Sequence, residues 1–245
     1  MSIKKHIPNF LTMLNLSAGL LALVHAFNGN YNEAFSLVCL GIFFDFWDGF
    51  FARKFNVSGD LGLQLDSLAD MVTSGVVPGL VMYKMFADIQ ENQAMYNLTE
   101  ETWFMGAVPY IGFIITLGSA YRLAKFNIDT RQTDSFIGLP TPANALFILS
   151  LPMILFQNQF EWVSAILVNP YFLVAISIFS AYILNAELPL FSLKIKNFTF
   201  EKYKLQIGFL VVSIILLALL HYLAIPVIIL LYVLLSVIVK PKAVK

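Results

Sequence analysis

The sequence predicts an all-α integral membrane protein with about eight transmembrane helices and with both termini in the cytoplasm. Apolar residues make up 59% of its 245 positions and charged residues only 12%, whereas a soluble domain is about half apolar and about one quarter charged. The apolar excess lies in runs close to the roughly 20 residues that a helix needs to cross a bilayer. Lys and Arg residues fall on alternate sides of these runs, which sets the orientation of the chain.

Eight segments satisfy these criteria. They are Asn9–Phe27, Ala34–Arg53, Asp66–Phe86, Trp103–Ala124, Pro142–Phe156, Trp162–Leu184, Leu205–Leu220 and Tyr222–Val239. A short turn, Lys54–Leu61, joins the second segment to the third. The fifth is short and follows Pro140 and Pro142, which suit a helix start because the first helical residues need no partner for their N–H groups. The last two segments are predicted to form a hairpin that turns near His221 and Tyr222.

The distribution of charge supports this count. With the N-terminus inside, fourteen of the 15 Lys and Arg residues fall in cytoplasmic segments, and only Lys84 does not. Trp103 and Trp162 begin spans on the opposite side, at the interface where aromatic side chains gather. No linker divides the chain, so we expect one domain over residues 1–245. A net charge of zero excludes the basic surface of a nucleic-acid-binding protein.

Four aspartates at the cytoplasmic ends of the second and third spans are unusual for a membrane protein. Asp45 and Asp48 are three residues apart, and Asp66 and Asp70 are four apart, so each pair shares one face of its helix. A charged carboxylate at the centre of a bilayer costs about 2.5–3.5 kcal/mol or more. If the two helices are antiparallel neighbours, the four groups converge, and oxygen ligands of this kind suit Mg²⁺ or Mn²⁺.

Two other interpretations of the aspartates are open. They are either solvated residues at helix ends, or partners of Arg53 and Lys54 in ion pairs. Carboxylates inside a membrane also mark ion pathways, so a divalent-cation transporter is a rival from a different functional class. A transporter would place its acids near the bilayer midplane, whereas these four lie near the cytoplasmic end of their spans.

The acidic segment carries a specific motif. It reads Asp45-Phe-Trp-Asp48-Gly49-Phe-Phe-Ala52-Arg53, then eight residues, Gly62, three residues, Asp66, three residues and Asp70. This pattern resembles the signature of the CDP-alcohol phosphatidyltransferase family at all eight of its fixed positions. The resemblance implies an enzyme of the inner membrane in which an alcohol attacks the β-phosphorus of a CDP-linked lipid and releases CMP.

The resemblance also implies a role for each residue of the motif. Asp45, Asp48, Asp66 and Asp70 are expected to bind two divalent cations, Mg²⁺ or Mn²⁺, and Asp70 is also expected to act as the general base. Contacts to the nucleotide and its diphosphate are expected from Asn9, Thr12, Gly49, Ala52, Arg53 and Gly62. Asn15 extends the polar face of Asn9 and Thr12, and either lines the same pocket or links two helices.

The acceptor alcohol is the least determined feature. Residues 8–16, 66–70, 122–127 and 138–143 are similar to the serine-using branch of the family, which implies CDP-diacylglycerol and L-serine as substrates. Arg122 is expected to bind the serine carboxylate, and Asn127 its ammonium group. Glycerol 3-phosphate and inositol phosphate are alternative acceptors. We expect a catalytic core at about residues 8–184, a C-terminal helical hairpin at about 205–239, a homodimer, and an active site facing the cytoplasm.

Overall fold

The computed structural model describes residues 6–57, 59–95, 106–129, 136–191 and 204–239, and it is almost entirely helical. The helices are α1 (Ile7–Phe27), α2 (Tyr31–Phe55), α3 (Asp60–Asp70), α4 (Val77–Met95), α6 (Ile114–Ile128), α7 (Thr141–Gln157), α8 (Glu161–Leu167), α9 (Pro170–Asn185), α10 (Lys204–Leu220) and α11 (Ala224–Val239). This confirms the predicted helical class. A small exception is an antiparallel pair of two-residue strands, β1 (Phe136–Ile137) and β2 (Pro189–Leu190).

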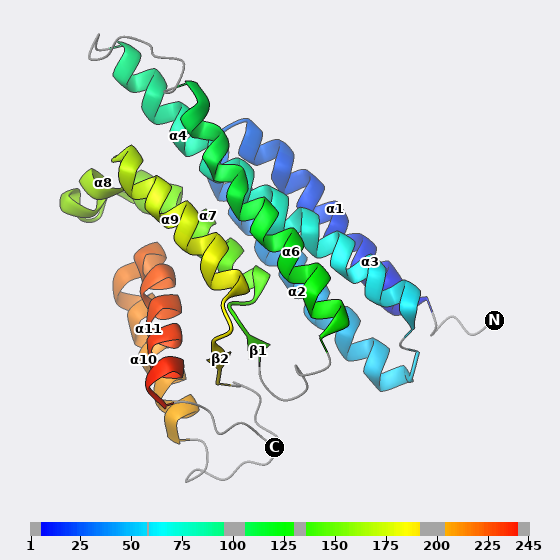
Figure 1. Cartoon of the computed structure of the whole chain (residues 1–245). Helices are drawn as coiled ribbons and strands as arrows, with labels where there is room; N and C mark the ends of the chain where they lie inside the picture. The colour runs from blue at the N-terminus through cyan, green and yellow to red at the C-terminus, as the bar shows by residue number, and fades with distance from the viewer. Residues whose placement is uncertain (1–5, 58, 96–105, 130–135, 192–203, 240–245) are drawn as a thin grey trace.

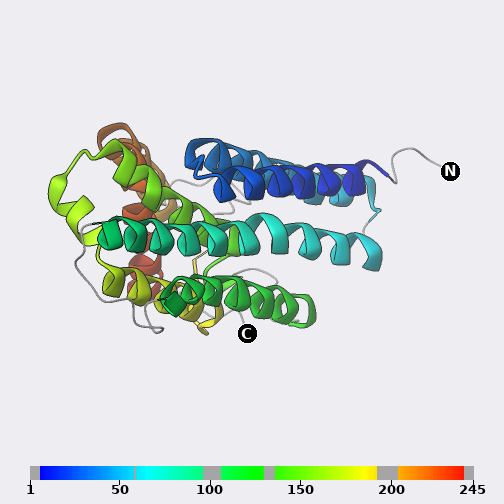
Figure 2. The ribbon, with the colours of Figure 1, turned by 90° about the horizontal axis from the view of Figure 1, so that it is seen from above.

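The helices form an elongated bundle in which α1 and α2 run in opposite directions, whereas α3 and α4 follow each other along one axis (Figures 1 and 2). The start of α1, the turn between α2 and α3, and the end of α6 lie toward the same end of this bundle (Figure 1). The main hydrophobic core lies toward the other end, where Val38, Met82, Phe86 and Ile148 are fully buried or nearly so. The polar residues of the motif therefore occupy one end of a bundle that its apolar core holds together at the other.

The third predicted helix differs from its prediction at both ends and in its middle. It begins at Asp60, six residues before the predicted Asp66, because the turn after α2 occupies only residues 56–59. Asn56 ends α2 in the left-handed conformation that closes many helices. A π-helical segment, Met71–Val76, separates α3 from α4. Thr116 Oγ1 of α6 donates a hydrogen bond of 3.0 Å to the Gly75 carbonyl within it, so a neighbouring helix supports this wider turn.

The sixth predicted span, Trp162–Leu184, is not one straight helix. The segment is divided into α8 and α9, which meet at an angle of 74°. Pro170 begins α9, and the Asn169 side chain caps it by accepting a hydrogen bond from the Tyr171 amide at 2.9 Å. Proline and a capping asparagine together favour a new helix start over continuation of the old one.

Helices α10 and α11 pack against each other as a hairpin. The chain turns at His221, whose φ of 49° is left-handed, and the rings of Phe209 in α10 and Tyr232 in α11 approach to 5.7 Å between centroids. Tyr232 also donates a hydrogen bond of 2.8 Å to the Phe191 carbonyl just after β2. The hairpin is thereby attached to the strand pair (Figure 1).

Four helical segments of the described chain are long and apolar enough to cross a membrane. They are Ile7–Phe27, Tyr31–Phe55, Asp60–Glu91 and Lys204–Ile238, and the last of these contains the hairpin turn. The bent pair α8–α9 brings the number to five if it counts as one span. The predicted start of the fourth span at Trp103 lies outside the described residues. The chain is thus a membrane protein by its helices, and the count of eight spans stays a prediction.

Candidate active site

Three of the four motif aspartates meet in one cluster. Asp45 and Asp48 come from α2 and Asp66 from α3, and each presents a carboxylate oxygen within 4.8 Å of the other two. Helix α1 packs against both α2 and α3. Asp70 lies outside this group of three but lines the same cavity. The predicted convergence is therefore present, with Asp70 at its edge.

The chemistry of this cluster fits a cation. Asp48 is only 5% exposed, and Asp66 Oδ1 is buried without a hydrogen-bond partner among the described residues. Carboxylate oxygens of Asp45, Asp48 and Asp66 lie within 4.8 Å of one another. Carboxylates held this close without Lys or Arg between them need a shared proton or a bound cation. An all-oxygen donor set of this kind matches Mg²⁺ or Mn²⁺.

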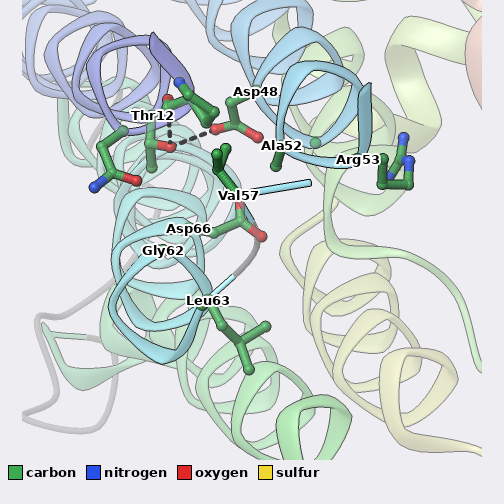
Figure 3. A pocket seen from close by; sticks show the side chains of 12 residues that line it. Thr12, Asp48, Ala52, Arg53, Val57, Gly62, Leu63 and Asp66 are labelled. Atoms are coloured by element: carbon green, nitrogen blue, oxygen red, sulfur yellow. Dashed lines mark hydrogen bonds between the residues drawn. The ribbon is translucent and has the colours of Figure 1, made fainter. Parts of the chain in front are cut away.

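Two cavities meet at the cluster. The smaller, of about 180 Å³, contains every residue that we predicted to contact the nucleotide: Asn9, Thr12, Gly49, Ala52, Arg53 and Gly62 (Figure 3). The larger, of about 390 Å³, is lined by all four aspartates and by parts of α6 and α7. Asp48, Gly49, Arg53 and Asp66 line both, so these four residues form a shared wall between the two spaces.

Glycines keep the smaller cavity open. A Cβ at Gly62 would face Asn9 Oδ1 at 3.5 Å, and a Cβ at Gly49 would lie 3.3 Å from Nη1 of Arg53. The guanidinium of Arg53 therefore lies close along the backbone of α2, at a place where a larger side chain would displace it. Gly59, at the N-cap of α3, lines the same cavity and has open space where a side chain would project.

Two side chains of helix α1 donate hydrogen bonds to the aspartates. Thr12 Oγ1 donates a hydrogen bond of 2.6 Å to Asp48 Oδ2, which Figure 3 shows as a dashed line. One turn later, Asn15 Nδ2 donates a bond of 3.1 Å to Asp70 Oδ1. The sequence placed Thr12 and Asn15 on one polar face, but it did not identify the carboxylates as their partners, since these lie 36 and 55 residues away.

Arg122 lies at the larger cavity and is only 6% exposed. Its Nη1 donates a hydrogen bond of 2.6 Å to the Ile137 carbonyl, and its Nη2 donates one of 3.3 Å to the Gly138 carbonyl. Gly138 has a φ of +76°, and a Cβ there would collide with the Leu184 carbonyl at 2.6 Å, so this turn requires glycine. Arg122 thus fixes the loop that leads into α7 while it lines the cavity.

Asn127 does not line either of these two cavities. It exchanges hydrogen bonds with Ser67, at 2.9 Å from its Nδ2 and 3.2 Å to its Oδ1, and Ser67 does line the larger cavity. Thr141, between Pro140 and Pro142 at the start of α7, is 4% exposed and lines it too. Sequence reasoning missed Ser67 and Thr141. Both lie in segments that are similar to the serine-using branch of the family, and Ser67 also follows Asp66 directly.

Comparisons with known proteins agree with this site. The sequence model of the CDP-alcohol phosphatidyltransferase family matches residues 5–178. The chain is 36% identical over 141 residues to the CDP-diacylglycerol–serine O-phosphatidyltransferase of Bacillus subtilis, which covers 56% of this chain and 70% of that protein.

Archaeal proteins are also similar. Identity is 34% over 163 residues to the CDP-diacylglycerol–serine O-phosphatidyltransferase of Methanocaldococcus jannaschii, with 66% of this chain and 68% of that protein covered. It is 31% over 156 residues to the archaetidylserine synthase of Methanothermobacter thermautotrophicus, with 62% and 60% covered. Enzymes of the matched family generally depend on divalent cations, in agreement with the aspartate cluster. Because the family model covers most of the chain, including every residue of the motif, this protein belongs to the CDP-alcohol phosphatidyltransferase family.

Proposed function

We propose that this chain transfers a phosphatidyl group from CDP-diacylglycerol to L-serine, forming phosphatidylserine and CMP. The observation that carries the proposal is the aspartate cluster on the wall between two cavities, one of which is lined by the signature residues. The names of the relatives supply the choice of serine. The new bond joins serine Oγ to the β-phosphorus, the bond from that phosphorus to the oxygen of CMP breaks, and the serine hydroxyl proton passes to a carboxylate.

The smaller cavity is the proposed site of the CDP group. Asn9 and the backbone beside Gly49 and Gly62 contact the nucleotide, and Ala52 leaves space for it. Arg53 borders both cavities and offers a planar, permanently charged group to the diphosphate oxygens. Thr12 supports this site indirectly, because its hydroxyl is bonded to Asp48.

Asp45, Asp48, Asp66 and Asp70 are the proposed ligands of two divalent cations, Mg²⁺ or Mn²⁺. Bound there, such cations neutralise the diphosphate and the charge that develops on the leaving oxygen. Asp70 is the proposed general base, since it lines the larger cavity at the edge of the cluster. A base has to lie within about 3 Å of the hydroxyl that it deprotonates, and this position leaves room for serine beside it.

The larger cavity is the proposed site of serine. Arg122 has donors beyond the two that bind backbone carbonyls, since a guanidinium carries five N–H groups, and these are offered to the serine carboxylate. Asn127 was expected to receive the ammonium group. Its position behind Ser67 supports a different contribution, in which it holds the Ser67 hydroxyl at the cavity.

For the whole chain we propose eight spans in the inner membrane, with both termini and the site facing the cytoplasm. The opposite directions of α1 and α2 (Figure 1) and the distribution of Lys and Arg support this arrangement. We also propose a single domain in which residues of about 8–184 form the catalytic core and the α10–α11 hairpin is attached to it through Tyr232. The family resemblance is our reason for proposing a homodimer. Cysteine labelling from either side and native mass spectrometry in lipid test these points.

The decisive experiment measures CMP release and lipid product from CDP-diacylglycerol with each acceptor in turn. Purified protein in lipid nanodiscs receives L-serine, glycerol 3-phosphate or inositol phosphate, with Mg²⁺ or Mn²⁺. We expect product only with serine, and no turnover by Asp70→Asn although CDP-lipid binding is retained. Product with another acceptor would reassign the substrate. No CMP release with any acceptor, together with Mn²⁺ flux in proteoliposomes, would favour the transporter. A CDP-linked ether lipid tests whether the donor resembles that of archaeal relatives.

A further inference from the structure

Asn15 makes two hydrogen bonds to the helical segment around Asp70. Its side chain is fully buried, and its Nδ2 donates a hydrogen bond of 3.1 Å to Asp70 Oδ1. Its backbone carbonyl accepts a bond of 3.2 Å from Thr73 Oγ1, almost one turn further along the same helix. The side chain and the main chain of one α1 residue thus fix both Asp70 and the π-helical segment that follows it.

Close helix packing surrounds Asn15. A Cβ at Gly41 of α2 would lie 2.8 Å from Asn15 Oδ1 and also 2.8 Å from Thr73 Cγ2. A Cβ at Gly19 of α1 would likewise collide with Thr73. Glycines therefore let α1, α2 and the π-helical segment pack closely around Asn15, whose Nδ2 donates its hydrogen bond to Asp70.

Asparagine at this position destabilises the fold, which indicates that its amide has another role. Asn15 Oδ1 is buried and has no hydrogen-bond partner among the described residues, and a buried acceptor without a partner destabilises the fold. An apolar side chain of the same shape would avoid that cost. The one thing it would not supply is the N–H group on Asp70. The benefit of asparagine here therefore lies at the carboxylate.

We infer that Asn15 is a positioning residue for Asp70. The inference rests on the proposed function, in which Asp70 is the general base. An amide N–H fixed on Oδ1 leaves the second oxygen, Oδ2, available to the larger cavity, which Asp70 lines. A base works only within hydrogen-bond reach of the proton that it removes, and an error of about 1 Å in position lowers a rate by about 100-fold. Asn15 holds the carboxylate so that one oxygen meets the serine hydroxyl.

The alternative is that Asn15 only joins α1 to α3. In that case its removal lowers stability and leaves the rate per folded molecule unchanged. A positioning role instead lowers kcat and leaves KM nearly unchanged, because the nucleotide residues and Arg122 are untouched. These two consequences are separable by measuring folding and turnover on the same samples.

The test replaces Asn15 with residues that lack the donor, Asn15→Leu, which has a similar shape, and Asn15→Ala. Ser17→Ala is the matched control, since Ser17 lies on the same helix, is exposed and donates to the Met13 carbonyl, its one hydrogen-bond partner among the described residues. We expect kcat with CDP-diacylglycerol and serine to fall about 10- to 100-fold in both Asn15 variants, with each KM within about threefold of wild type. Ser17→Ala is expected to match wild type, and melting temperature and gel-filtration profile are recorded for every variant.

Wild-type turnover is measured first, because it tests the proposed function separately from the positioning role of Asn15. If wild-type protein forms no lipid product with any alcohol, the proposed function itself is wrong. If wild type is active and Asn15→Leu keeps its kcat, or loses only stability, or changes only KM, the positioning role is refuted. Should Asn15→Leu fail to fold, Asn15→Ala, which also removes the donor to Asp70, decides alone. It is expected to lower kcat without moving KM, and an unchanged kcat there refutes the inference equally.

Discussion

Removing the Thr12 hydroxyl is expected to weaken the metal site without disturbing the fold. Thr12 is 3% exposed, and its Oγ1 lies 2.6 Å from Asp48 Oδ2, which is short, as expected for a hydrogen bond to a carboxylate. Such bonds contribute about 1.5–3 kcal/mol. Since about 1.4 kcal/mol corresponds to a factor of ten, Thr12→Val is expected to raise the Mn²⁺ concentration for half-maximal activity about 10- to 150-fold. Valine keeps the volume and branching of threonine, so helix packing is preserved.

The assay measures CMP release against Mn²⁺ concentration at saturating CDP-diacylglycerol and serine. Ser17→Ala controls for loss of a hydroxyl from α1, because Ser17 Oγ donates to the Met13 carbonyl, four residues earlier, and to nothing else in the described part of the chain. Thr12→Ser keeps the donor and is expected to stay within about threefold of wild type. If Thr12→Val needs no more Mn²⁺ than wild type does, the hydrogen bond does not organise Asp48, and our interpretation of the α1 face is refuted.

Three further outcomes are expected. Asp66→Asn removes one carboxylate of the aspartate cluster. Turnover at saturating Mn²⁺ is therefore expected to fall more than about 100-fold in the CMP-release assay. Near-normal turnover would exclude Asp66 as a metal ligand. Arg122→Lys keeps the charge but loses the planar guanidinium group with its paired N–H donors. The KM for serine is therefore expected to rise about tenfold or more, while the KM for CDP-diacylglycerol stays constant. Equal changes in both KM values would contradict a contact between Arg122 and serine. Gly59→Ser supplies the missing N-cap side chain of α3 in open space. It is expected to stabilise the protein by about 0.5–1 kcal/mol, which is measured as a higher melting temperature in detergent. A lower melting temperature would show that the cap is not formed.

The aspartate motif was predictable because its paired residues are close together in the sequence. Residues three and four apart share a helix face whatever the rest of the chain does, so the pairing of Asp45 with Asp48 needed no structure. The C-terminal hairpin was equally accessible, since two strongly apolar runs are separated by little more than His221. The break at Pro170 also had a sequence signal, a proline after asparagine, but the apolar residues on both sides concealed it.

Contacts between distant segments could not be read from the sequence. Arg122 binds the carbonyls of Ile137 and Gly138, and backbone acceptors leave no trace in residue types. Asn15 meets Asp70 only because Gly41 lets α1 and α2 come together. The position of Asn127 behind Ser67 likewise depends on how α6 crosses α3. Such details follow from helix packing, which periodicity alone does not specify.

The wall common to both cavities has a kinetic consequence. With Asp48, Gly49, Arg53 and Asp66 facing each space, lipid donor and amino acid can be held side by side, and neither has to vacate its compartment for the other to enter. Transfer then takes place within a ternary complex, so double-reciprocal plots should intersect where a ping-pong scheme would give parallel lines. Labelled CMP should not enter the donor lipid while serine is withheld, because no phosphatidylated enzyme exists to receive it.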